Sequence, residues 1–269
     1  MPSWSEIRRA SAVDVEGVGL AAVSESDVVD HVLGELASGR GGWVSSVNID
    51  VLRQCAIDLR LRALVNSADL TVADGTPIVW LTRLRGTPVP ERVAGSSLIS
   101  ALPAHLVAAR RSLFLLGGNP GIADHAAAEF QRRHPALRVV GTHCPPLGFE
   151  SQPQELEAVQ SALTAARPDV VYVGLGFPKQ DWLIEVLRPV FASTWFISCG
   201  ISLSFIAGEV RRAPRWAQVA GLEWVFRIRE EPRRLFGRYI RDDLPFAARL
   251  FASAAASRVA RRASVQSRA

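Results

Sequence analysis

Between residues 112 and 200, four apolar segments alternate with three helical ones, and this alternation limits the possible fold more than any other feature. The apolar segments are continuous, as expected for strands covered on both faces. Strands separated by helices of about 10–15 residues are typical of a parallel, doubly wound sheet. The strands are SLFLLGG (112–118), LRVVGTH (137–143), DVVYVGLG (169–176) and TWFISCG (194–200), and the helices are NPGIADHAAAEFQRRHP, QELEAVQSALTAARP and PKQDWLIEVLRPV.

The preceding residues continue this pattern. Residues 25–39 predict a helix, because their apolar side chains fall on one face and a glycine follows as a stop. Next come a strand within 41–50 that ends at Asn48, a helix over 50–67 and a strand over 70–74. The segments TPIVWLTRLRG, which has a proline suited to a first helical turn, and GSSLISALPAHLVAAR are predicted helices. We therefore predict an α/β fold: a Rossmann-like parallel sheet with helices on both faces.

Charged residues are distributed unevenly along the chain. From Glu209 onward, 14 arginines and six acidic residues give a net charge of +8; because the whole chain carries +5, residues 1–208 carry −3. A basic end on a near-neutral body suggests an anionic partner, such as a membrane surface, nucleic acid or a phosphorylated substrate. We expect four parts: an N-terminal leader (1–24), a Rossmann-like domain (25–208), a C-terminal Arg-rich helical appendage (209–250) and a disordered tail (251–269).

The composition excludes several classes of protein. Apolar residues make up 48% of the 269, which argues against a disordered chain. No apolar run reaches the roughly 18 residues of a membrane-spanning helix, and no signal-peptide core is present, so we expect a cytoplasmic protein. The three cysteines form no CxxC pair and the five histidines show no HxxxH or HExxH spacing. We therefore expect no disulfide, no metal and no cofactor.

Polar residues and glycines gather where the predicted strands end. Asp74 interrupts the apolar run LTVADGTPIVWL, and a charge there is costly unless it is used or satisfied. In open α/β sheets, ligands bind beyond the carboxyl ends of the strands, which is where Asp74 and Asn48 fall. Asp74 could form a turn, cap the helix that begins near Pro77, or act as a catalytic carboxylate.

Two glycine-containing loops follow strands in the same way. The loop LLGGNPGIAD places Gly117, Gly118 and Asn119 before a helix, where backbone amides attract phosphate. It lacks the GxGxxG fingerprint of dinucleotide sites, so phosphate contact and a simple tight turn are both open readings. The loop VGLGFPKQDW holds Gly174, Gly176, Lys179 and Gln180, of which Lys179 is the only lysine in the chain. This second loop suits a diphosphate or a sugar, or is a solvated first turn.

No DxD triplet, which many nucleotide-sugar enzymes use to hold a divalent ion, occurs in the sequence. The charge of a leaving diphosphate would then have to be met by arginine, lysine and backbone amides. Arg92, in the segment PERVAG, is one candidate. Further arginines lie in the appendage among tryptophan, phenylalanine and tyrosine residues, a mixture that suits a membrane interface, nucleic acid or a plain solvated face.

Six motifs, in this order and spacing, resemble the bacterial WecG/TagA/CpsF glycosyltransferases over roughly residues 25–245. The most specific is the last, and any single glycine motif would be weak. They are SVNID, ADGTPIVW, ERVAG, LFLLGGNPG, VGLGFPKQ and RRAPRWAQVAGLEWVFRIREEPRRLFGRY.

The resemblance implies a metal-independent, inverting glycosyltransferase. Such enzymes move an N-acetylmannosamine-type sugar from a UDP-sugar donor to an undecaprenyl-diphosphate-linked (polyprenyl) acceptor in the synthesis of cell-surface polysaccharide or teichoic acid. It implies that Asp74 is the catalytic base and that Ser46 and Asn48 lie near a sugar. It further implies that Arg92 and Gln180 line the pocket. The arginines assigned to the lipid diphosphate or the membrane are Arg211, Arg212, Arg227, Arg234 and Arg238.

By the same resemblance, the appendage closes over the site at the cytoplasmic face of the inner membrane, and a homo-oligomer is compatible with this arrangement. The sequence departs from the family pattern at two positions. Many members have aspartate where Ser204 stands, and Ser46 replaces a commoner threonine. The first departure leaves the role of the Ser204 loop open, and the donor sugar is open because the family includes members with different donors.

Two other functions are compatible with parts of the sequence. A nucleotide-dependent oxidoreductase on the same fold is disfavoured by the missing GxGxxG fingerprint. A nucleic-acid-binding protein would use the basic appendage, but the net-negative body argues against this role, so we expect no nucleic-acid partner. The fold alone cannot choose among these functions, because Rossmann-like folds carry many activities.

Overall fold

The protein is built on a six-stranded parallel sheet with the strand order β4-β3-β8-β7-β5-β6. The computed structural model describes residues 12–266, without the side chains of Arg215, Val219, Arg234 and residues 259–266. The predicted fold class is confirmed, since every neighbouring pair of strands in this sheet runs parallel. The strands are β3 (Gly42–Val47), β4 (Leu70–Ala73), β5 (Ser112–Gly117), β6 (Arg138–His143), β7 (Val170–Gly174) and β8 (Trp195–Ser198).

Alternate residues of the central strands pack into two separate hydrophobic cores, one on each face of the sheet. In β5, Leu113 and Leu115 pack into one core, while Phe114 and Leu116 pack into the other. Both sets are buried, which explains why these strands read as continuous apolar runs. The period of two along a strand thus turns one hydrophobic segment into two packing surfaces.

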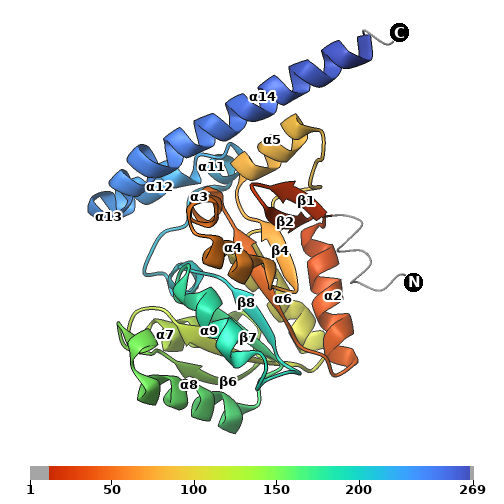
Figure 1. The fold of residues 1–269 in the computed structure, drawn as a ribbon. Coiled ribbons are helices and arrows are strands. Elements are labelled where there is room, and N and C mark those ends of the chain that lie inside the picture. Colours follow the sequence, from red (N-terminus) through yellow and green to blue (C-terminus); the bar gives the residue numbers. More distant parts are fainter. Residues whose placement is uncertain (1–11, 267–269) are drawn as a thin grey trace.

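Helices cover both faces, and Figure 1 shows the two layers around the sheet. The first core is closed by α2 (Glu25–Ala37), α6 (Gly95–Ala108), α7 (Ile122–Arg133) and α10 (Ser202–Ile206). The opposite face is covered by α3 (Ile49–Ile57), α4 (Leu59–Asn66), α8 (Pro153–Ala166), which follows the short turn η1 (Phe149–Ser151), and α9 (Lys179–Leu187).

Local capping sets the ends of several helices. Ser24 and Asp27 form a reciprocal capping box at the start of α2. The single helix expected over 50–67 is two helices, because Asp58 leaves helical geometry and its side chain accepts from the amide of Arg60 to cap α4. Gly86, in the left-handed conformation, ends α5 (Thr76–Arg85).

The N-terminal part of the described chain is ordered, although we expected a leader without structure of its own. β1 (Ala12–Val15) and β2 (Val18–Ala21) form an antiparallel hairpin joined by Glu16 and Gly17, both at positive φ. This geometry matches the two-residue turns that suit twisted strands. Val15, Val18 and Leu20 are fully buried in a core shared with α3 and α5, which explains why the segment folds back onto the domain.

The C-terminal appendage is helical, as predicted. It consists of α11 (Arg215–Val219), α12 (Glu223–Glu230), α13 (Pro232–Phe236), the π-helical segment η2 (Gly237–Asp243) and α14 (Leu244–Gln266). Where we expected a disordered tail from residue 251, α14 continues and packs along α5 (Figure 1). Phe246, Leu250 and Ala254 are the buried contacts that hold it there. None of the helices in the described part of the chain has the length and apolar character needed to cross a bilayer.

Candidate active site

A cavity of about 1330 Å³ opens at the carboxyl ends of β3, β4, β7 and β8 and is bounded on its other side by the appendage. Most of the residues predicted for the site line it. They are Ser46, Asn48, Asp74, Arg92, Gly118, Asn119, Gly174, Gly176, Lys179, Gln180, Arg227 and Arg238. The strand ends therefore bring together residues as far apart in the chain as Ser46 and Gln180. This is where ligands bind in open α/β sheets.

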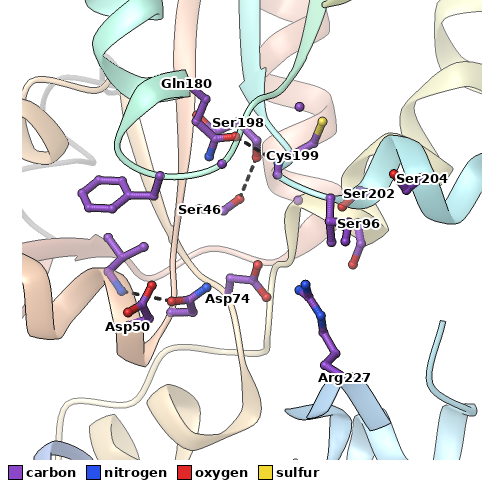
Figure 2. Close-up of a pocket in the computed structure, with 18 of the residues that line it drawn as sticks. Ser46, Asp50, Asp74, Ser96, Gln180, Ser198, Cys199, Ser202, Ser204 and Arg227 are labelled. Carbon is purple, nitrogen blue, oxygen red and sulfur yellow. Dashed lines mark hydrogen bonds between the residues drawn. The ribbon is translucent and has the colours of Figure 1, made fainter. Parts of the chain in front are cut away.

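Asp74 follows β4 directly and points into this cavity (Figure 2). Its backbone amide donates to the carbonyl of Val47 at 2.8 Å, which continues the pairing of β4 with β3 by one residue. The N-cap of α5 is Gly75, at φ 119°, so the side chain of Asp74 does not occupy the capping position. The prediction that Asp74 caps α5 is thus wrong. Its carboxylate lines the cavity instead.

The surroundings of Asp74 change its acidity. Burial raises the pKa of the carboxyl from 3.8 to about 6, and the nearby charge of Glu223 adds to the rise. Arg92, Arg212 and the amide of Gly95 oppose it by favouring the charged form. A carboxyl with a pKa near 6 is ionised at neutral pH and yet basic enough to accept a proton from a substrate.

Ser46 and Asn48 lie beside Asp74 at the end of β3. The Ser46 hydroxyl donates to the carbonyl of Ser198 at 3.3 Å and so connects β3 to the end of β8. Asn48 is the N-cap of α3, and its Oδ1 accepts from the amide of Val51 at 3.1 Å. Figure 2 shows the hydrogen bond between Ser46 and Ser198. Asn48 therefore has a structural role in addition to lining the cavity.

The first glycine loop is shaped by close backbone approach. Gly117 does not line the cavity; a Cβ there would lie 2.7 Å from the carbonyl oxygen of Gly174, so only glycine fits between β5 and β7. The amide of Gly118 donates to that same carbonyl at 2.8 Å and is not available to a phosphate. Asn119 lines the cavity and donates through Nδ2 to Glu209 at 3.1 Å. The tight-turn reading therefore describes Gly117 and Gly118 better than phosphate binding does.

In the second loop, Lys179 and Gln180 begin α9. Lys179 forms an ion pair with Glu150, with Nζ 2.5 Å from Oε1. Gln180 is 5% exposed, and its Oε1 accepts from the amide of Gly200 at 3.0 Å. Both side chains line the cavity. One is held by a carboxylate and the other by the turn that follows β8.

The appendage arginines occupy different positions. Arg227 reaches into the cavity in the direction of Asp74 (Figure 2), and its guanidinium lies 3.6 Å from the carboxylate of Glu231. Arg212 donates to Ser96 at 2.9 Å, close enough to Asp74 to affect its pKa. Arg211 is exposed and does not line the cavity. The side chain of Arg234 lies outside the described part of the structure.

Arg238 belongs to a charged cluster that the sequence did not predict. Its guanidinium lies 3.6 Å from Asp50 and 4.0 Å from Asp243. Arg53 bridges the same two carboxylates, at 2.7 Å from Asp50 and 2.9 Å from Asp243. Burial raises the pKa of Asp243 to about 6, while Arg53 and Arg238 oppose the rise. This cluster of Asp50, Arg53, Arg238 and Asp243 joins α3 to η2 at the edge of the cavity.

Several further residues at the site were not predicted. Ser96, Ser198, Glu223 and Ser204 line the cavity, and Asp181 lies beneath it. Ser204 is 5% exposed in α10, where an aspartate was expected from the family pattern. Asp50 and Asp181 sit inside the quoted motifs SVNID and PKQDW, and an acidic residue next to an apolar run was the only signal for either. Among residues 12–266, no cluster of three or more His, Cys, Asp or Glu side chains could hold a metal ion.

The sequence matches known proteins along most of its length. Residues 13–260 match the model of the glycosyl transferase WecG/TagA/CpsF family. An N-acetylglucosaminyldiphosphoundecaprenol N-acetyl-beta-D-mannosaminyltransferase from Bacillus spizizenii is 25% identical over 221 residues, which cover 79% of this chain and 84% of that protein. The protein of the same name from Bacillus subtilis is 25% identical over 194 residues, covering 72% of this chain and 73% of that protein.

The matched region contains the sheet, the cavity and the appendage helices. It also contains Asp74 and the other cavity residues, so the family model covers the site as well as the fold. The family resemblance is thereby confirmed, and the oxidoreductase and nucleic-acid-binding alternatives are set aside. The chain belongs to the WecG/TagA/CpsF family of glycosyltransferases.

Proposed function

We propose that this glycosyltransferase moves an N-acetylmannosamine-type sugar from a UDP-sugar to an undecaprenyl-diphosphate-linked N-acetylglucosamine. The acceptor is taken from the names of the two Bacillus relatives, and the sugar transferred is taken from the same names. The observation that carries the proposal is the placement of Asp74. It is an acidic side chain in a large cavity at the strand ends, with a pKa raised to about 6.

The chemistry we propose is a single displacement. The acceptor hydroxyl oxygen attacks the anomeric carbon of the donor from the side opposite to UDP, and the bond from that carbon to the diphosphate breaks. Asp74 takes the proton of the hydroxyl as the new bond forms. One displacement inverts the configuration at the anomeric carbon. General-base assistance of this kind contributes about 10²–10⁴-fold to the rate.

The departing UDP gains negative charge, which cationic side chains at the cavity can stabilise. The side chains of Arg227, Arg238 and Lys179 all line it, and each lies within 4.0 Å of a carboxylate. These carboxylates hold the cations in place before the substrate binds. A diphosphate can then share or replace them, since arginine binds phosphate oxygens well. This arrangement supports a metal-independent reaction.

The appendage suits attachment to the cytoplasmic face of the inner membrane, where the lipid-linked acceptor would be presented. Trp216 is 62% exposed, Phe236 is 58% exposed, and Val225 on α12 is 43% exposed. Exposed aromatic and apolar side chains among arginines are typical of proteins that bind at a lipid surface. We propose that these residues contact the lipid while the cavity receives the head of the acceptor.

The proposal is tested by measuring UDP release from a panel of UDP-sugars, with a short-chain prenyl-diphosphate-linked N-acetylglucosamine as the acceptor. We expect release to require both substrates, to be strongest with UDP-N-acetylmannosamine and to persist in EDTA. Loss of activity in EDTA, restored by a divalent cation, would contradict the metal-independent mechanism. Absence of release with every donor would contradict the proposed reaction.

A further inference from the structure

A buried aspartate that the proposed chemistry does not use lies beneath the cavity. Asp181 is in the first turn of α9 and is 1% exposed. Its Oδ1 accepts from the hydroxyl of Ser45 at 2.8 Å and from that of Ser198 at 3.3 Å. The Ser198 hydroxyl accepts at 3.0 Å from the indole N–H of Trp43, and it donates to Asp181 because an ionised carboxylate can only accept.

These contacts join three elements that form the floor of the cavity. Ser45 belongs to β3, Ser198 ends β8, and Asp181 belongs to α9. The neighbours of all three face the substrate side. Ser46, next to Ser45, hydrogen-bonds to the carbonyl of Ser198, and Gln180, next to Asp181, binds the amide of Gly200. The carboxylate of Asp181 thus lies behind two predicted substrate-binding side chains.

Asp181 is also next to Gln180 in the chain. The Gln180 side chain favours the charged form of Asp181 and so lowers its pKa, as the hydroxyls of Ser45 and Ser198 do. The Oε1 of Gln180 accepts from the amide of Gly200. This hydrogen bond fixes which end of the Gln180 amide faces the turn after β8. The N–H groups and remaining lone pair of Gln180 are therefore directed in a fixed way.

The energetic cost of this arrangement argues against a purely structural role. Burial opposes ionisation of Asp181 and raises its pKa to about 6. Its second oxygen, Oδ2, is buried without a hydrogen-bond partner of normal geometry. Leaving a buried polar atom unpaired destabilises the fold, and an apolar side chain of similar size would avoid that cost. The carboxylate therefore has a use beyond packing, because its Oδ1 fixes the hydroxyl donors of the cavity floor.

We propose that Asp181 is a positioning residue for glycosyl transfer. From beneath the cavity it fixes the orientation of Gln180 and the separation of Ser46 from the turn after β8. This inference rests on the proposed function, because the side chains it positions are those proposed to hold the substrates. Asp181 is not among the residues that line the cavity, so its role would be to position their side chains rather than to touch a substrate.

The test compares Asp181→Asn with a matched control, Asp169→Asn. Asp169 is also an aspartate that accepts hydrogen bonds, in its case from Ser112 and Arg111. It precedes β7 and therefore lies at the amino ends of the strands, away from the cavity at their carboxyl ends. Asparagine at 181 keeps the shape but removes the charge and one of the two acceptor oxygens, which weakens the hydrogen bonds from the hydroxyls of Ser45 and Ser198. We expect kcat/KM to fall about 10- to 100-fold, the effect of a small displacement of substrate-positioning groups. Asp169→Asn should leave kcat/KM within about twofold of wild type at equal loss of Tm.

A second measurement does not depend on activity. The amide of Gly200 is held by Gln180, so its hydrogen exchange reports the orientation of that side chain. We expect Asp181→Asn to speed exchange at Gly200, and Asp169→Asn to leave it unchanged. If the wild-type protein released no UDP, the proposed function would fail, and the exchange result would still decide the role of Asp181.

Unchanged exchange at Gly200 together with kcat/KM within twofold of wild type would overturn the proposal. So would an equal kinetic loss in both variants at matched stability, because that result would reflect destabilisation alone. If Asp181→Asn does not fold, Ser45→Ala removes one donor from the same carboxylate. We then expect a smaller change in the same direction at Gly200, and no change there would reject the positioning role.

Discussion

Arg92 and Glu223 form an ion pair, with Nη1 2.8 Å from Oε2, that joins the α/β domain to α12 of the appendage beside Asp74. Arg92 also lies 3.4 Å from the side-chain oxygen of Gln218 in the appendage. Glu223 raises the pKa of Asp74, while Arg92 lowers it. The position of the appendage therefore helps to set the acidity of the proposed catalytic base.

Replacing Glu223 by glutamine should move the acid limb of the kcat/KM profile to lower pH. In the wild type we expect kcat/KM to fall about tenfold per pH unit below about 6, as Asp74 becomes protonated. Removing the charge of Glu223 removes a cause of the raised pKa. Glu230→Gln, a change at an exposed residue of the same helix, is the control and should leave the profile in place. A shift to higher pH in Glu223→Gln would contradict the electrostatic role.

Asp74→Asn should lower kcat by about 10²–10⁴-fold, the usual contribution of a general base. Asparagine keeps the size of the side chain but cannot take the proton. Affinity for the UDP-sugar, measured by calorimetry, should stay close to that of wild type. Turnover near the wild-type rate would exclude Asp74 as the base.

The same substitution should stabilise the protein at neutral pH. The pKa of Asp74 is raised from 3.8 in the unfolded chain to about 6 in the folded protein, so the folded state binds the proton more tightly. The charged carboxylate therefore destabilises the fold fully above about pH 6 and not at all below about pH 4. We expect Asp74→Asn to raise the free energy of unfolding by about 1–2 kcal/mol at pH 7.5. The gain should disappear near pH 4, and denaturant unfolding at both pH values would show it.

Arg53→Ala should destabilise the protein strongly, because it leaves Asp50 and Asp243 buried without their closest cation. The side chains of these two aspartates are 8% and 7% exposed. Breaking a buried ion pair from one side costs about 3–5 kcal/mol. The loss should be larger at pH 8 than at pH 5, where Asp243, with a pKa near 6, takes up a proton.

Arg60→Ala is the matched control for this change. Arg60 pairs with Asp58 at 3.0 Å, but its side chain is 92% exposed. Exposed ion pairs contribute at most about 1 kcal/mol. Thermal unfolding of both variants would separate the two situations, and equal losses would contradict a buried cluster between α3 and η2.

Changing Trp216 and Phe236 together to serine should reduce binding to vesicles that contain anionic lipid. Both side chains are exposed on the appendage, where arginines supply attraction to the lipid head groups. High salt should weaken the binding of the wild-type protein to these vesicles, because salt screens the attraction between the arginines and the lipid head groups. Val190→Ser, at a 62% exposed position in the turn after α9, should bind vesicles as wild type does. Equal binding by all three proteins would reject the appendage as the lipid contact.

The alternation of segments predicted the fold and the edge of the sheet at which Asp74, Asn48 and Gln180 meet. This worked because burial on both faces of a parallel strand is visible in one continuous apolar run. The break at Asp58 was missed, since an aspartate can continue a helix or cap one. The β1–β2 hairpin was missed although Glu16-Gly17 between valines is a turn signal.

Contacts between distant segments could not be predicted in this way. Arg53 and Asp243 are 190 residues apart, and Ser45 and Asp181 are 136 apart. Each contact depends on strand order, register and helix rotation together, which no local pattern specifies. The sequence predicts the appendage arginines as a group. Their acidic partners Glu231, Asp50 and Asp243 could be identified only from the structure.

The packing of α14 on α5 means that the sheet and the cover of α5 are completed at different times during the synthesis of this protein. α5 begins directly after Asp74 and Gly75, and α14 covers it with residues that leave the ribosome more than 160 positions later. All six strands of the sheet have been translated by Ser198. A nascent chain can therefore complete its sheet, because domains fold as units during translation, while α5 still lacks its cover. The strand ends that carry the site can thus be in place before the appendage that bounds the cavity has been made.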